Sequence, residues 1–428
     1  MLRQSLVLVL SVFTFVSCNI SQNSEEQDQH WDNKLSTEEN IASHALAFQS
    51  DSVFPFLDEL AKTRSVLILG EAGHGDATTM GVKRNMISYL STKGIKAVAF
   101  EGFPFLSCYL LSNREYSSFT KEWQPESGTK STWAQEMFHE IRYFLDNNIK
   151  VIGIDVYAGF YDIDAAQIIL NKYQKEDPFQ MDWKKLKDYY YRKFIYPVYV
   201  NQISNISVSE QVELMQMINS ISNYTHYLIH KKGKTIDFGA LLQWIRNINA
   251  NFSFIKLFED NIDIYHNIPI TTLPFRNRDS QIADNILWQT EYFPKEKFTV
   301  WIANYHGVKD ISQTINPTDS LLYYIHQCAA EGVYNKLGDK VYSLAFTSLN
   351  CIGNDNFETG ALESAIAKQT GDAPFAFIDF ETLRFADGYR DKEFEAAMIK
   401  KKRGKWLYMF DGIYYIKNQQ VLPGFDTH

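Results

Sequence analysis

One stretch decides the fold of this chain: residues 65–75, which read SVLILGEAGHG. The apolar run from Val66 to Leu69 is typical of a buried β-strand, and it ends abruptly at Glu71 and His74 with glycines on either side. In open α/β sheets, ligand sites lie just beyond the carboxyl ends of the strands. The stretch therefore predicts a buried strand that leads into a functional loop.

The same change from apolar strand to polar loop recurs at three later points. The predicted strands and the polar residues after them are 96–100 before Glu101, 151–154 before Asp155, and 298–302 before Asn304 and His306. If these strands share one sheet with residues 66–69, their polar side chains converge on one edge of it. Such a collection of carboxylates and histidines suits hydrolytic acid–base chemistry.

Helical and strand patterns alternate along most of the chain. Apolar residues recur at helical spacing over 77–92 and again over 133–147, each time before another strand pattern. This alternation predicts an α/β fold with a mainly parallel central sheet flanked by helices. From residue 165 to about 257 no clear strand pattern occurs, and amphipathic segments predict an inserted helical lobe, at about 165–270, over the carboxyl rim of the sheet. Further strands are predicted at 341–346, 374–380 and 406–410.

The N-terminus has the pattern of an export signal. Arg3 precedes an apolar run from Leu6 to Val16, which is too short to span a membrane and is typical of a secretory signal peptide. Cys18 follows closely, as a lipoprotein signal requires, because its thiol is acylated and it becomes the first mature residue. We expect 1–18 to be a signal peptide with a lipidated Cys18, and the exported protein to be lipid-anchored in the cell envelope. An ordinary signal peptide with an incidental Cys18 is the alternative.

Composition limits the remaining possibilities. Residues 19–40 are rich in Ser, Asn, Gln, Asp and Glu, which predicts a flexible tether before a folded domain at 41–428. The net charge of −9, without a basic stripe, argues against binding to nucleic acid. The remaining cysteines, Cys108, Cys328 and Cys351, have no spacing that predicts a disulfide framework.

The residues at the predicted sheet edge suggest a mechanism. An imidazole titrates near neutral pH and can act as a general base, and a carboxylate three residues before it on a glycine-rich turn can orient it. His74 and Glu71 are such a pair. The sequence has no GxSxG nucleophile elbow, so direct attack by an activated water is the simpler mechanism. Lys83, Asp155 and Asn304 are candidate supporting or substrate-binding residues.

The ordered motifs resemble those of the erythromycin esterase family. They are GEAGHG at 70–75, Glu101, Arg278-Asp279, and WIANYH at 301–306. The resemblance extends more thinly from about residue 55 to the C-terminus. It implies a small-molecule ester or lactone as substrate, with no metal and no cofactor. In that family's terms His74 would match the base that activates water, Glu71 the acid that orients it, Glu101 the second essential carboxylate and His306 the downstream histidine.

Two positions depart from the family pattern. Ala303 stands where the family usually has a histidine, and Lys83 where it usually has an arginine. A lysine keeps the charge but lacks the planar fork of a guanidinium. These differences favour an ester other than a macrolide.

Two other functions use the same residues. Glu71, His74, Glu101 and His306 carry oxygen and nitrogen donors that could bind zinc or manganese, so a metal-dependent hydrolase is one alternative. A lipoprotein that binds a small ligand without converting it is the other.

Overall fold

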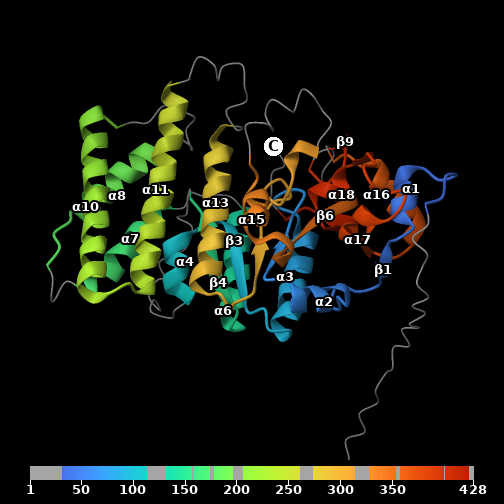
Figure 1. The fold of residues 1–428 in the computed structure, drawn as a ribbon, viewed down its shortest axis with the longest axis horizontal. Coiled ribbons are helices and arrows are strands. Elements are labelled where there is room, and N and C mark those ends of the chain that lie inside the picture. The colour runs from blue at the N-terminus through green and yellow to red at the C-terminus, as the bar shows by residue number, and fades with distance from the viewer. Residues whose placement is uncertain are drawn as a thin grey trace, which may run out of the picture.

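A computed structural model describes residues 31–112, 132–156, 159–173, 178–195, 206–260, 273–313, 327–352, 357–399 and 401–423. Within these ranges one eight-stranded sheet has the order β1-β7-β10-β6-β2-β5-β3-β4. Its strands are β1 (Leu46–Phe48), β2 (Val66–Leu69), β3 (Ala97–Pro104), β4 (Lys150–Asp155), β5 (Phe298–Trp301), β6 (Val341–Ile352), β7 (Phe375–Asp379) and β10 (Gly412–Gln420). Neighbours are parallel, except that β7 is antiparallel to both β1 and β10. The predicted α/β fold with a mainly parallel central sheet is confirmed (Figure 1).

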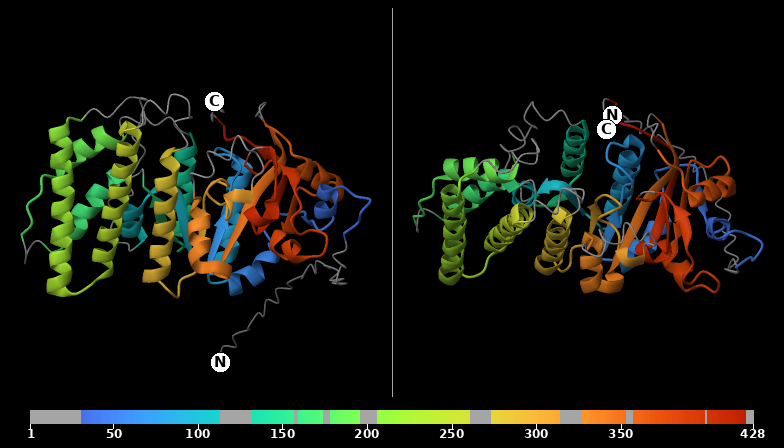
Figure 2. Two further views of the ribbon diagram at one scale, coloured as in Figure 1. Left: turned by 45° about the horizontal axis from the view of Figure 1, so that its top comes forward. Right: turned by 90° about the horizontal axis from the view of Figure 1, so that it is seen from above.

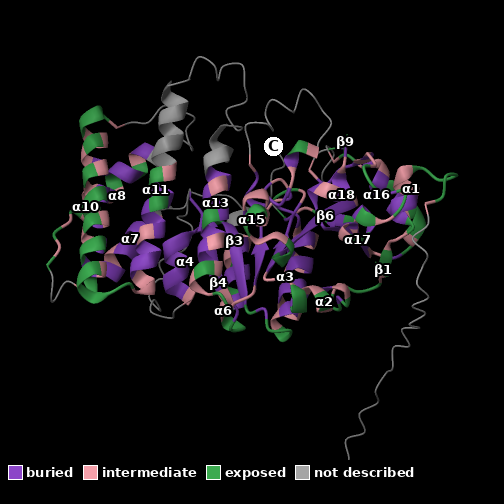
Figure 3. Cartoon of the chain, viewed as in Figure 1, coloured by how far each residue is buried: buried purple, intermediate pink, exposed green. Residues whose placement is uncertain are grey.

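Helices cover both faces of the sheet, which explains why β2 is apolar at every position. Leu67 and Leu69 face a core that also contains α2 (Phe56–Thr63), α3 (Ala77–Thr92) and α6 (Thr132–Asp146). Val66 and Ile68 point to the opposite face, against α13 (Leu273–Tyr292) and α15 (Ala329–Leu337). The two layers of helices can be followed in the turned views of Figure 2. Figure 3 shows the sheet buried between them.

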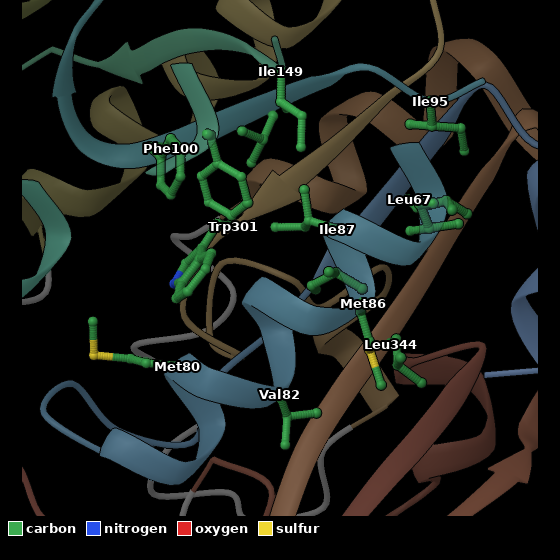
Figure 4. Close-up of a cluster of buried hydrophobic side chains, with 14 of the residues drawn as sticks. Leu67, Met80, Val82, Met86, Ile87, Ile95, Phe100, Ile149, Trp301 and Leu344 are labelled. Carbon is green, nitrogen blue, oxygen red and sulfur yellow. The ribbon is translucent and has the colours of Figure 1, made fainter. Parts of the chain in front are cut away.

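The core beneath the site packs α3 against the sheet. Met80, Met86 and Ile87 from the helix meet Trp301 of β5 and Phe100 of β3 in one buried cluster (Figure 4). The rings of Phe100 and Trp301 have their centroids 5.5 Å apart. Trp301 therefore has a fixed position directly below the carboxyl ends of β5 and β3.

The predicted helical lobe lies between β4 and β5 in the sequence. It consists of α7 (Gly159–Asn171), α8 (Trp183–Tyr190), the π-helical turn η1 (Tyr191–Ile195), α10 (Val208–Lys232) and α11 (Ile236–Asp260). With α4 (Phe105–Ser112) these helices form a separate apolar core. They extend the molecule beyond the β4 edge of the sheet (Figure 1), while α13 returns the chain to the sheet and lies against β4.

The described part of the chain begins at Trp31, and residues 31–40 of the predicted tether pack on the folded domain, which begins before Ile41. The helix α1 (Thr37–Ala42) starts with a capping box: the Ser36 hydroxyl accepts from the backbone N–H of Glu39, and the Glu39 carboxylate accepts from the backbone N–H of Ser36. Polar residues of this kind also occur in flexible tethers, so their presence alone does not predict the helix. The ring of Trp31 packs 5.1 Å from that of Tyr389. Cys18 and the rest of 1–30 lie outside the described residues. No described helix is long and apolar enough to cross a membrane.

The strand predicted at 406–410 is wrong. Trp406–Met409 forms the short helix α18, and the strand follows it as β10. A short apolar run does not distinguish a buried helical turn from a buried strand, and Trp406, Leu407 and Met409 are all buried. The remaining elements are the 3-10 turns η2 (Ile311–Gln313) and η3 (Gly338–Lys340), α16 (Ala361–Thr370), α17 (Phe380–Phe385), and the strand pair β8 (Phe394–Ala396) and β9 (Lys402–Gly404).

Candidate active site

The register of the sheet brings the predicted polar residues to one edge. Trp301 at the end of β5 pairs with Leu69 of β2 on one side and with Phe100 of β3 on the other, and Phe100 pairs with Gly153 of β4. Leu69, Trp301, Phe100 and Gly153 therefore lie at nearly the same level of four adjacent parallel strands. The polar residues at or beyond this level are Glu71 and His74 after β2, Glu101 within β3, Asp155 at the end of β4, and Asn304 and His306 after β5.

Local geometry fixes the turn that carries His74. Gly75 has a φ of 86°, in the left-handed region that favours glycine, and it lets the chain turn into α3. Asp76 then caps the helix by accepting hydrogen bonds from the backbone of Thr78 and Thr79. Gly70 has no room for a side chain, because a Cβ there would lie 1.9 Å from Asn304 Oδ1.

Glu71 and His74 form a hydrogen-bonded pair. The Oε1 atom of Glu71 lies 2.7 Å from Nδ1 of His74. Glu71 is buried, whereas 43% of the His74 side chain is exposed. The pair therefore combines a fixed carboxylate with an imidazole that solvent can reach.

The second carboxylate oxygen of Glu71, Oε2, accepts hydrogen bonds from two buried side chains. Nζ of Lys83 lies 3.0 Å from Oε2, and Nε1 of Trp301 donates to the same oxygen at 2.9 Å. Lys83 is fully buried and stands 4.5 Å from the centre of the Trp301 ring. Burial lowers the pKa of Lys83 to about 8, although Glu71 opposes the shift. Lys83 is thus the partner of a carboxylate, while Arg84 points away and pairs with Glu140 at 3.3 Å, as its position on the helix predicts.

Opposing effects set the protonation of the Glu71–His74 pair. Burial alone would raise the pKa of Glu71, but the positive charge of Lys83 and the contact with His74 hold it below its usual value. Desolvation alone would lower the pKa of His74, but the hydrogen bond to Glu71 and the charge of Glu71 raise it above its usual value. The pair therefore consists of an ionised carboxylate and an imidazole that is more basic than a free one.

A second, buried cluster surrounds Arg278 of α13. Its guanidinium donates through Nε and Nη2 to the two oxygens of Asp155, at 3.1 and 2.6 Å. The Nη2 atom also lies 2.9 Å from Oε1 of Glu101. The other Glu101 oxygen accepts from the backbone N–H of Ala303 at 2.7 Å. Apart from the family resemblance, no local pattern marked Arg278, because a charged residue inside a helix pattern usually faces solvent.

His306 belongs to this buried cluster. Its Nδ1 atom lies 2.5 Å from Oδ1 of Asp279, and its Nε2 atom lies 3.2 Å from Oε1 of Glu101 and 3.1 Å from Nη1 of Arg278. Burial would lower the pKa of His306, but the negative charges of Asp279 and Glu101 raise it to about 10. Burial also opposes ionisation of Glu101, yet His306 and Arg278 hold its pKa well below the usual value. His306 is therefore a fixed imidazolium at neutral pH, not a titrating base.

Asn304 is a supporting residue that joins the site to the sheet. Its side-chain nitrogen donates to the carbonyls of Phe346 and Met398, and its oxygen accepts from the N–H of Phe346 at 3.1 Å. Its own N–H donates to the carbonyl of Glu71 at 2.7 Å. Its side chain thus holds the loop after β5 against β6 and Met398, and its backbone N–H holds that loop against the loop after β2.

The carboxylates of the site are already paired with positively charged side chains. Within the described ranges, no group of three or more His, Cys, Asp or Glu side chains is placed to hold a metal ion. Arg278 lies between the carboxylates of Asp155 and Glu101 and satisfies both. The Glu71 carboxylate is likewise paired with Lys83.

Solved structures share this fold. A protein from Bacillus cereus matches with a TM-score of 0.63 at 16% identity, over 90% of this chain and 97% of that chain. A succinoglycan biosynthesis protein matches at 0.57 with 14% identity, over 90% and 97%. An erythromycin esterase carrying a histidine-to-asparagine substitution, in its open conformation, matches at 0.58 with 12% identity, over 85% and 93%. No family profile and no curated protein matches the sequence. These identities show a shared fold and a distant structural relationship.

Proposed function

We propose that this protein is a hydrolase that cleaves an ester or lactone by attack of a water molecule activated by His74. The observation that carries the proposal is the pairing of an exposed imidazole with a fully held, buried carboxylate, Glu71. A base of this kind must meet solvent and substrate, and its tautomer must be fixed. Glu71 fixes it by accepting from Nδ1, so that Nε2 takes the proton of the water.

Each neighbour has a role in this mechanism. Glu71 stabilises the imidazolium as His74 takes a proton, and Lys83 and Trp301 keep the carboxylate in place. His306 and Arg278 place N–H groups at the same sheet edge, and their positive charges are balanced by Asp155, Glu101 and Asp279. Glu101 and Asp155 orient these two cations.

Lys83, Ala303 and the likeness to solved structures bear on the class of substrate. The likeness to an erythromycin esterase supports hydrolysis, whereas the likeness to a succinoglycan biosynthesis protein shows that this fold alone does not name a substrate. Lys83 has no guanidinium fork, and Ala303 offers only its backbone N–H, which Glu101 already accepts. We therefore propose an ester other than a macrolide, reached by a protein that is exported and lipid-anchored through Cys18.

The test is hydrolysis of a panel of esters and lactones that includes 4-nitrophenyl acetate and erythromycin. His74→Ala should lower kcat/KM on the best substrate by about a hundredfold or more, since general-base removal costs that much. His226→Ala, which changes an exposed histidine of α10, is the matched control. Equal activity of His74→Ala and the wild type would reject the assignment. Loss of activity on chelation, restored by zinc or manganese, would favour a metal-dependent hydrolase instead.

A further inference from the structure

The helix that supplies Arg278 carries a buried polar stripe. Arg278, Gln281, Asn285 and Gln289 of α13 are spaced so that they share one face of the helix, and all are at most 9% exposed. The apolar residues Ile282 and Ile286 of the same helix pack on the sheet instead. Buried polar side chains of this kind need hydrogen-bond partners, so the stripe raises the question of what satisfies it.

The stripe meets α11, which lies beside α13 (Figure 1), at Asn285. Gln243 of α11 donates to Oδ1 of Asn285 at 2.8 Å. Gly239, one turn earlier on α11, lies against the ring of Tyr292, which is further along α13. The two helices are therefore antiparallel, and one turn from the Gln243–Asn285 pair toward Arg278 brings Asn247 opposite Gln281.

These two successive pairs of amides differ in their hydrogen bonding. In the first pair, Asn285 donates to the carbonyl of Ile154 at 2.9 Å, and Gln243 accepts from Arg246 at 3.1 Å. In the second pair, Asn247 Nδ2, Asn247 Oδ1 and Gln281 Nε2 are buried and have no hydrogen-bond partner. Asn247 is 3% exposed and Gln281 is 7% exposed. Unpaired buried amides are unfavourable, so a water molecule or a bound ligand is needed to supply the hydrogen bonds that the described residues do not make.

The position of this pair connects it to the site. Gln281 lies one turn from Arg278, which contacts Asp155, Glu101 and His306. On its other side lies Asn285, bonded to Ile154 just before Asp155. A group bound at Asn247 and Gln281 would thus lie one helical turn from the Arg278 cluster.

We propose that Asn247 and Gln281 form a subsite for a neutral, polyhydroxylated part of the substrate, with the chemistry of a sugar. Two amide donors and one amide acceptor match hydroxyl groups, each of which both donates and accepts. A charged group is disfavoured, because neither amide offers a counter-charge and Arg278 is already paired with carboxylates. This inference rests on the proposed function, and it makes the substrate an ester of a sugar.

Two acetate esters test the subsite through catalysis: 6-O-acetyl-D-glucose, which carries sugar hydroxyls, and n-hexyl acetate, which carries none. The variants Asn247→Leu and Gln281→Met remove the amides and keep the size of the side chains, and Asn223→Leu on the exposed face of α10 is the control. Each variant should raise KM for the sugar ester about tenfold, the effect of losing one to two neutral hydrogen bonds, and leave KM for hexyl acetate unchanged. Equal effects on both esters, or none on either, would overturn the proposal.

Binding without turnover separates this proposal from the proposed function. Methyl glycosides of neutral hexoses should bind the full chain in isothermal titration calorimetry, equally well in His74→Ala, and at least tenfold more weakly in Asn247→Leu. That result would stand even if no ester were hydrolysed. If none of these glycosides binds the wild type saturably, the proposed subsite is overturned.

Thermal unfolding adds a readout that a purely structural role would not give. Asn247→Leu removes two unpaired buried polar atoms, so the ligand-free variant should melt at the same temperature as the wild type or higher. A clear fall in Tm would mean that Asn247 has structural partners and would overturn its assignment to a subsite.

Discussion

Replacing Glu71 by glutamine tests how the carboxylate controls His74. The carboxylate accepts from three donors, at His74, Lys83 and Trp301. Glutamine has a single acceptor oxygen. If that oxygen stays with Lys83 and Trp301, the amide NH₂ faces Nδ1 and fixes His74 in the tautomer that cannot take a proton at Nε2. The loss of kcat should then be on the order of 10³–10⁴, as for other acid–histidine pairs that lose the correct tautomer.

The same substitution changes the pH dependence. In the wild type, Glu71 raises the pKa of His74 above its usual value, and the base acts only when deprotonated. The rate should therefore rise with pH through a midpoint above about 6.5. Glu71→Gln removes the carboxylate, so the midpoint should move to lower pH while the plateau falls.

The assay is kcat/KM for the best ester between about pH 5 and 9, since imidazole titrates in that range. Glu59→Gln on α2, an exposed carboxylate paired with Lys62, is the control and should leave the profile unchanged. Glu71→Gln also leaves Lys83 buried without its counter-ion, at a cost of about 3–5 kcal/mol, so circular dichroism must first show a folded variant. Trp301→Phe keeps the charge and removes one donor, so its midpoint should stay above about 6.5. A wild-type midpoint that persists in folded Glu71→Gln would refute the reasoning.

Two further predictions concern the buried cluster and the anchor. Arg278→Met leaves Glu101 and Asp155 buried without their shared cation, so chemical denaturation should show a loss of about 3–5 kcal/mol in the free energy of unfolding; a loss below about 1 kcal/mol, the worth of an exposed pair, would show that the network contributes little. Cys18→Ser should abolish labelling by a fatty-acid probe and partition into membranes, because anchoring depends on the acyl chains. A wild-type protein that is exported in soluble form would contradict the lipid anchor.

Much of the fold could be predicted because β2 and its neighbours are buried on both faces and alternate with amphipathic helices. The convergence of Glu71, Glu101, Asp155 and His306 followed from one geometric fact, that parallel strands end at the same edge. The helix at 77–92 is found with the predicted bounds as α3.

The rest depended on contacts between distant segments. Nothing local shows that Arg278 turns inward to form a fork with Asp155, since that requires α13 to lie against β4. The indole of Trp301 donates to Glu71 from another strand, although the residue looks like ordinary core in the sequence. The different surroundings of the two histidines also depend on contacts between distant segments. His74 is partly exposed, whereas His306 is buried beside the carboxylates of Asp279 and Glu101.

The measurement that tests the account most directly is an NMR titration of both histidines beside the pH dependence of ester hydrolysis. The account predicts that the kinetic midpoint coincides with the titration of His74, above about pH 6.5. It also predicts that His306, whose pKa is raised to about 10, keeps its proton throughout that range. A rate that follows the titration of His306, or that rises where neither ring titrates, would contradict the assignment of His74 as the base.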